Sequence, residues 1–276
     1  MALLLCGVAC GASILWSAFR DRDAFRREKG NLALLGAMEA AIYFCATLGI
    51  SDFLLNTLLF RRLRLAGDEK LPGTLVTCGL TPGAVMAFSY LRSEEPVELL
   101  TLVPCAAAIM LGCVCGARIV GGLDGAKIRR IMGFALIGSM CALILRIIVG
   151  RGAAGAAVGL SAPRLAVAVA FSFFWGVVNM IGVPMKPAGT AVFLLLGMSP
   201  LATLTMIIVV GSIGPLGGAL SIFRSGRYHK KSACAAVLSG TAGAVLGTLF
   251  TISISAALLN ILLLLVMLIA IISMFR

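Results

Sequence analysis

The sequence Asn179-Met-Ile-Gly-Val-Pro-Met-Lys-Pro-Ala-Gly-Thr190 interrupts an apolar segment that runs from residue 164 to residue 198. Proline removes a backbone donor and glycine favours turns, so a helix is expected to end within this stretch. The arm that remains after the break is short, about nine to twelve residues. At about 1.5 Å per residue it reaches roughly half way across a bilayer. We therefore predict a broken helical hairpin that is at least partly re-entrant.

A second apolar segment, residues 31–60, follows the same pattern. It carries Glu39 and is broken around Gly49, Ser51 and Asp52, again leaving a short second arm. We predict a second broken hairpin here. The two hairpin tips are expected at residues 49–56 and 179–190.

The rest of the chain also has the composition of a membrane protein. Of its 276 residues, 61% are hydrophobic and 12% are charged, and the mean hydropathy is +1.09. A soluble domain carries about 25% charged residues. Seven further apolar runs are long enough to span a bilayer of about 30 Å; these are 2–19, 71–91, 99–117, 131–149, 200–223, 232–250 and 256–275. The first run has no Lys or Arg before it, so we predict a retained helix and not a signal peptide.

The net charge of +12 is concentrated in short loops between apolar runs. No basic stretch is interleaved with aromatic residues, so nucleic acid is not an expected partner. Basic loops mark the cytoplasmic side of a membrane, and four loops qualify: 20–29, 61–70, 118–130 and 224–231. The chain is thus predicted to be a multi-pass protein of the cell membrane, with its N-terminus outside and Arg276 in the cytoplasm.

An internal repeat links the two hairpins. Residues 71–93 align with residues 203–225 without a gap, and Gly79 meets Gly211. Each hairpin is followed by three spans, an odd number, so the second copy enters the membrane from the opposite side. The predicted fold is an all-α integral membrane bundle of two inverted repeats. Its parts are an extra N-terminal helix and loop (1–30), a first repeat (31–149), an external linker (150–163) and a second repeat (164–276).

Inverted repeats with broken segments at matching places are typical of secondary transporters, whose substrate site lies near the midplane. The polar side chains at or near the two tips are therefore the predicted substrate-binding residues: Lys186, Asn179, Asn56, Asp52, Thr190 and Ser51. A lysine beside a helix N-terminus suits an anion. Alternatively, Lys186 reaches an interface and has no such role.

The two carboxyls in the first hairpin each have two interpretations. Asp52 follows the break, where it could cap the short helix, pair with Lys186 or carry a coupling proton. Glu39 lies in the long arm, where it could carry a proton or simply hydrogen-bond within the bundle. Both are candidates for proton coupling.

Other residues favour structural roles. The pairs Gly112/Gly116 and Gly243/Gly247 suit close helix packing. His229, the only histidine, lies in a basic loop and is expected to be solvated. The nine cysteines lack metal-site or disulfide spacing, so neither a metal nor another cofactor is expected. An intramembrane protease or zinc enzyme needs histidine at membrane depth, and we therefore expect no enzyme.

The sequence 112–133, with Gly116-Ala-Arg118 before a basic loop and the next helix, resembles the TauE/SafE family of sulfite exporters. The sequence 196–203, Leu-Gly-Met-Ser-Pro-Leu-Ala-Thr, is similar to the segment after that family's second hairpin. The family carries a glycine-rich run in each hairpin, whereas this chain has Asp52 and Lys186 there. The resemblance implies export of sulfite, organosulfonates or related small anions.

The predicted function is therefore alternating-access transport of a small anion, with protons as a candidate coupling ion and the lipid bilayer as the surroundings. The alternative is a channel or permease for another small solute or a cation. A non-transporting assembly factor and a homodimeric assembly both stay open.

Overall fold

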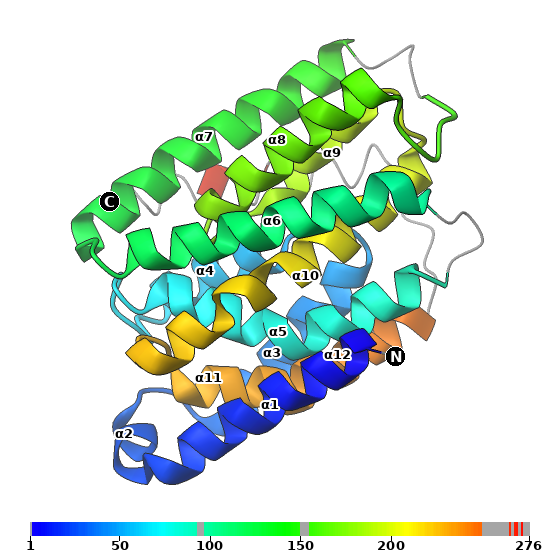
Figure 1. Ribbon diagram of the computed structural model, residues 1–276. Coiled ribbons are helices and arrows are strands. Elements are labelled where there is room, and N and C mark those ends of the chain that lie inside the picture. The colour runs from blue at the N-terminus through cyan, green and yellow to red at the C-terminus, as the bar shows by residue number, and fades with distance from the viewer. Residues whose placement is uncertain are drawn as a thin grey trace.

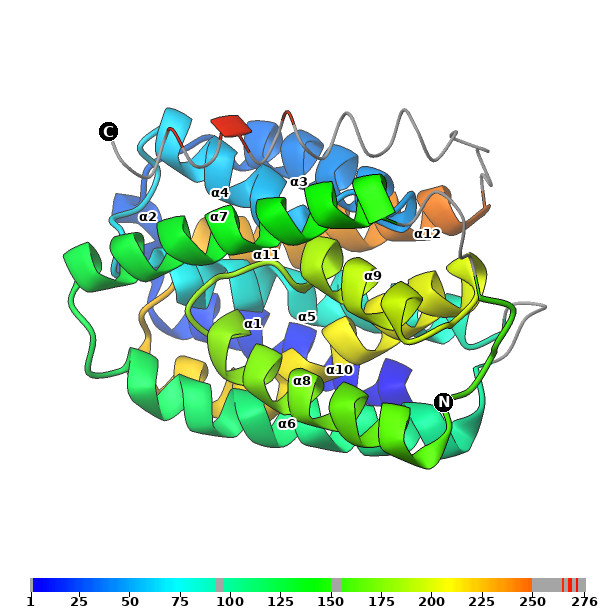
Figure 2. The same cartoon turned by 90° about the horizontal axis from the view of Figure 1, so that it is seen from above.

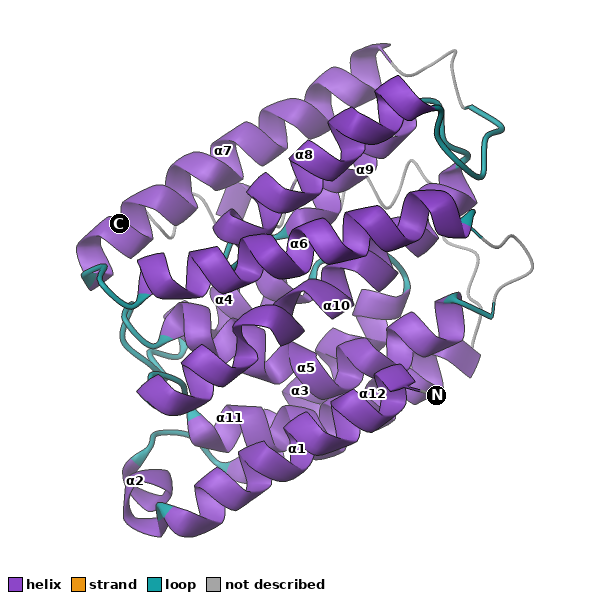
Figure 3. Cartoon of the chain, in the orientation of Figure 1, coloured by secondary structure: helices purple, strands orange, loops and turns teal. Residues whose placement is uncertain are grey.

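The computed structural model describes residues 2–92, 97–149 and 155–249, with single positions at 265, 268, 269 and 272. These residues form helices and loops without a strand (Figure 3). The helices are α1 (Ala2–Arg20), α2 (Arg22–Arg27), α3 (Leu32–Thr47), α4 (Asp52–Arg62), α5 (Leu71–Tyr90), α6 (Leu99–Val120), α7 (Gly125–Val149), α8 (Ala162–Asn179), α9 (Met185–Leu195), α10 (Pro200–Ser225), α11 (Lys230–Ala235) and α12 (Thr241–Leu249). A π-helical turn, Ala236–Gly240, joins the last two.

Six described helices are long and apolar enough to cross a membrane: α1, α5, α6, α8, α10 and the continuous Lys230–Leu249. Large apolar side chains are exposed on several of them, among them Leu111, Phe174 and Leu249. Such faces suit lipid better than water. These features define a multi-pass helical membrane protein. The predicted span 131–149 lies within α7, whereas 256–275 lies outside the described residues apart from the four single positions.

The helices run side by side around a central pair, α5 and α10 (Figures 1 and 2). The central α5 is the most deeply buried of the six. Helices α6, α7, α8 and α9 lie on one side of this pair, and α1, α3, α11 and α12 lie on the other. The two short arms, α4 and α9, therefore start inside the bundle.

Each predicted hairpin is broken into a longer and a shorter helix. Their long arms are α3 (16 residues) and α8 (18 residues), and both short arms have 11 residues. The second long arm, α8, is by itself long enough to span a bilayer. Each break contains a left-handed glycine, Gly49 (φ +92°) or Gly182 (φ +100°). Backbone of this kind favours glycine because a Cβ would clash.

The short arms also end alike. The Leu65 amide donates to the Phe60 carbonyl, and the Met198 amide donates to the Phe193 carbonyl, both over 3.1 Å. Both phenylalanine side chains are buried. The glycine of the break and the two residues of this closing hydrogen bond are spaced alike in both hairpins. Gly182, Phe193 and Met198 each lie 133 residues after their counterparts Gly49, Phe60 and Leu65.

Two glycine pairs let helices pack closely, as predicted. A Cβ at Gly112 of α6 would lie 2.0 Å from the Phe173 carbonyl oxygen of α8, and one at Gly116 would lie 2.4 Å from that of Val177. In the same way, a Cβ at Gly243 of α12 would lie 2.1 Å from the Ala40 carbonyl oxygen of α3. Each long hairpin arm thus packs against a helix that belongs to the other half of the sequence.

Candidate functional site

The two hairpin breaks meet at Lys186. This lysine lies in the first turn of α9, and its Nζ is 3.0 Å from Oδ1 of Asp52. The same ammonium donates to the carbonyl oxygens of Ala46 (3.2 Å) and Ile50 (3.0 Å). The Lys186 side chain is 13% exposed and that of Asp52 is 12% exposed. The Lys186 side chain is therefore mostly shielded from solvent within an ion pair, and does not reach for an interface.

The helix ends explain why this pair forms. The last carbonyls of α3 have no partners within the helix and carry partial negative charge, which favours a cation. One of them, the Ala46 carbonyl, accepts a hydrogen bond from Lys186. The next, the Thr47 carbonyl, accepts one from the Tyr90 hydroxyl at 2.6 Å. The first turn of α4 favours an anion for the opposite reason, and Asp52 is its first residue.

The prediction that Asp52 caps α4 is wrong. Ser51 occupies the capping position, and its Oγ accepts a hydrogen bond from the Leu54 amide at 3.4 Å. Ser51 can do this because its backbone is extended while its short side chain folds back. The Asp52 carboxylate is thereby left to pair with Lys186.

A small cavity of about 40 Å³ opens beside this ion pair. Four predicted site residues line it: Ser51, Asp52, Asn179 and Lys186. The remaining lining comes from the breaks and from the central helices: Phe53, Gly79, Gly83, Met86, Pro184, Met185, Ile207, Ile208, Gly211, Ser212 and Pro215. The central helices contribute Gly79 and Gly83 from α5 and Gly211 and Pro215 from α10, two pairs that are each separated by 132 residues. The cavity is thus enclosed by both breaks and both central helices.

The other predicted residues lie away from the cavity wall. Asn56 donates from Nδ2 to Oε2 of Glu39 at 3.4 Å, and Glu39 is 1% exposed. The Thr190 hydroxyl donates to the Lys186 carbonyl at 2.7 Å within the same helix.

Asn179 lines the cavity and donates to the Val183 carbonyl at 3.4 Å, but its buried Oδ1 accepts no hydrogen bond from any described residue.

Sequence reasoning missed part of the site. The carbonyls of Ala46 and Ile50 were not foreseen, since any residue can supply a carbonyl and only the fold decides which ones converge. Gly79 and Gly211 were matched by the repeat but not assigned to the site. Each of them lies in the first span after a broken hairpin, and this matching position was the signal that could have assigned them to the site.

His229 is buried, contrary to the prediction that it is solvated. It is 2% exposed, and its Nδ1 accepts a hydrogen bond from the Ser232 amide at the start of α11. Its ring packs edge-on against Phe60, and Nε2 lies 3.8 Å from Oε2 of Glu28. Its own amide donates to Thr74. The loop folds inward because these contacts join α11 to α4, α5 and the segment after α2.

This burial predicts how stability depends on pH. Burial lowers the pKa of His229, as do Lys70 and Lys231, while Glu28 raises it. An unfolded histidine titrates at about pH 6.5, so below that pH the unfolded chain binds more protons than the folded one. Stability should therefore fall as the pH drops from about 6.5 towards the lower folded pKa.

The variant His229→Asn keeps a capping acceptor but cannot titrate. Its melting temperature in detergent should decline less than that of wild type when the pH is lowered through this window. Equal declines for the two proteins would show that His229 does not cause the effect.

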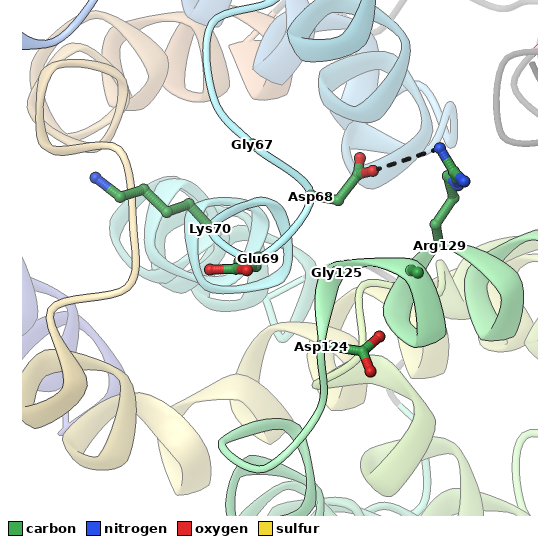
Figure 4. Close-up of a pocket in the computed structure, with 8 residues that line it drawn as sticks. Gly67, Asp68, Glu69, Lys70, Asp124, Gly125 and Arg129 are labelled. Atoms are coloured by element: carbon green, nitrogen blue, oxygen red, sulfur yellow. Dashed lines mark ion pairs between the residues drawn. The ribbon is translucent and has the colours of Figure 1, made fainter.

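A second, larger cleft of about 590 Å³ lies between the α4–α5 loop and the start of α7 (Figure 4). Asp68 bridges its walls: it is 2.8 Å from Arg61 and 3.9 Å from Arg129. The lining mixes Asp68, Glu69 and Asp124 with Lys70 and Arg129. Because these charges nearly cancel, the cleft does not select strongly for anions or cations.

Comparison of the chain with models of known protein families, with curated proteins and with solved structures found no match. The resemblance to sulfite exporters therefore stays a prediction. The class is defined by the structure itself: a multi-pass helical membrane protein with a small charged cavity between two helix breaks.

Proposed function

We propose that this chain is a secondary transporter of small anions, with its substrate site in the cavity between the two hairpin breaks. The observation that carries the proposal is Lys186. A charge within a membrane protein is costly, and such residues usually mark substrate or ion pathways. Here the cation lies beside a cavity at the start of a broken helix, the arrangement that suits an anionic ligand.

The pairing of the two halves supports alternating access. Hairpins, central helices and glycine pairs recur at intervals of about 132 residues, and each long arm packs on a helix of the other half. We propose that these halves are inverted repeats, with the boundaries predicted from the sequence. Rocking of one half against the other would then open the cavity to each side in turn.

The size of the cavity favours a small substrate. A cavity needs about 10–15 Å³ for each water molecule, so 40 Å³ holds about three waters. Sulfite and the smallest organosulfonates belong to this size class, and the resemblance to sulfite exporters points to the same compounds.

Transport of radiolabelled sulfite and methanesulfonate into proteoliposomes tests the proposal. Because Lys186→Met alone would leave Asp52 unpaired, the double variant Lys186→Met/Asp52→Asn is the one to compare with wild type. Losing a hydrogen bond to a charged group costs about 1.5–3 kcal/mol, so uptake should fall by at least about tenfold. Lys127→Met removes an exposed lysine and is the control.

Two outcomes would contradict the proposal. Equal uptake by wild type and the double variant would remove Lys186 from the site. Uptake that rises linearly with anion concentration, without saturation or exchange, would indicate a channel instead of a transporter.

A further inference from the structure

The Lys186 ammonium already has three partners among the described residues. It donates to the carbonyl oxygens of Ala46 and Ile50 and forms an ion pair with Asp52, and an ammonium has three N–H donors in all. The two carbonyls belong to the backbone, Ala46 to the last turn of α3 and Ile50 to the break, and cannot leave without moving it. The Asp52 carboxylate is a side chain that borders the cavity, so it is the partner that an anion can replace.

We infer that an anion replaces Asp52 on Lys186 only when Asp52 carries a proton, so that each anion crosses together with one proton. This inference rests on the proposed anion-transport function and adds its coupling ion.

Charge balance is the reason. The observed pair is neutral, and adding a monovalent anion to it would leave a net negative charge in a site largely shielded from water, which is costly. A proton on one Asp52 oxygen forms an O–H bond and cancels this charge. The neutral carboxyl then becomes a donor and can hydrogen-bond to the anion that has taken its place.

The cycle closes without any other reactant. On the far side the anion leaves, Asp52 returns its proton to water, and the ion pair forms again. Lys186 and Asp52 are paired in the structure, and such a pair would neutralise both charges while the site reorients.

Other titratable groups near Asp52 come from two helices. Tyr43 and Glu39 lie on α3, and Cys78 lies on α5. The Tyr43 hydroxyl and Oδ2 of Asp52 both lie next to Gly79, where a Cβ would be 3.7 Å and 3.8 Å away from them. From α10, the residues lining the cavity include no titratable one. None of these three groups makes an ion pair with Lys186 in the described residues, whereas Asp52 does.

Methanesulfonate is a suitable probe because it stays charged across the working pH range, so only the protein titrates. Wild-type proteoliposomes that contain a pH-sensitive dye should take up one proton for each methanesulfonate. An inward gradient of one pH unit should drive about tenfold accumulation, since each unit is worth about 1.4 kcal/mol.

Asp52→Asn resembles the protonated state permanently. It should keep exchange of methanesulfonate for methanesulfonate but lose proton-driven net uptake, because the empty site would carry an unpaired lysine. Asp23→Asn, which changes an exposed carboxylate on α2, should behave as wild type.

The two hypotheses fail in different ways. If wild type takes up methanesulfonate without protons, or if Asp52→Asn keeps proton-driven accumulation, the coupling inference is wrong and anion transport stands. If wild type shows no exchange of sulfite or methanesulfonate at any pH, the proposed function is wrong and the inference falls with it.

Discussion

Replacing Lys186 with methionine is expected to destabilise the folded chain by about 3–5 kcal/mol, the range found when one partner of a buried ion pair is removed. The Asp52 carboxylate would stay at a site that is 12% exposed, without its cation. The Ala46 and Ile50 carbonyls would lose the same donor. Methionine has nearly the length of lysine, so loss of packing contributes little.

A double-mutant cycle separates this charge effect from other causes. Lys186→Met/Asp52→Asn removes both charges and should recover most of the lost stability, since neutral partners of similar shape often replace a buried pair at little cost. Thermal melting in detergent near neutral pH gives the stabilities of wild type, the two single variants and the double variant. If the two single changes add without coupling, the pair does not stabilise the fold.

The hairpins show what a single sequence can predict. Gly49 and Gly182 interrupt apolar segments that are too long for one span and too short for two. The positions of the breaks can therefore be predicted from the local sequence alone. The meeting of Asp52 with Lys186 was one of several roles that the sequence left open for Asp52. It follows from two matching breaks that both lie at the centre of the bundle.

The failures concern details that depend on tertiary packing. Ser51 and Asp52 are both good capping residues by type, and only the pairing of Asp52 with a lysine 134 positions away decides between them. His229 stands among basic residues that are typical of a solvated loop, yet Phe60, Thr74 and Glu28 surround it. No local pattern around His229 indicates that these three residues converge on it.

The glycine contacts provide the second large effect. Gly112→Ala is expected to destabilise the chain by about 1–3 kcal/mol, the usual cost of overpacking, and Gly112→Leu by more. A Cβ at this position would lie 2.0 Å from the Phe173 carbonyl oxygen. That atom belongs to the backbone of α8, so the two helices must separate before the side chain fits.

Gly138 in α7 is the matched control, because a Cβ there would meet nothing within 4 Å. Gly138→Ala should stabilise the chain by about 0.5–1 kcal/mol through its higher helix propensity.

Gly243→Ala should destabilise the chain about as much as Gly112→Ala, since its Cβ would lie 2.1 Å from the Ala40 carbonyl oxygen. The Gly112→Ala/Gly243→Ala double variant should show the sum of both losses, because the contacts share no residue. If Gly112→Ala melts at or above the wild-type temperature, α6 and α8 do not depend on this close approach.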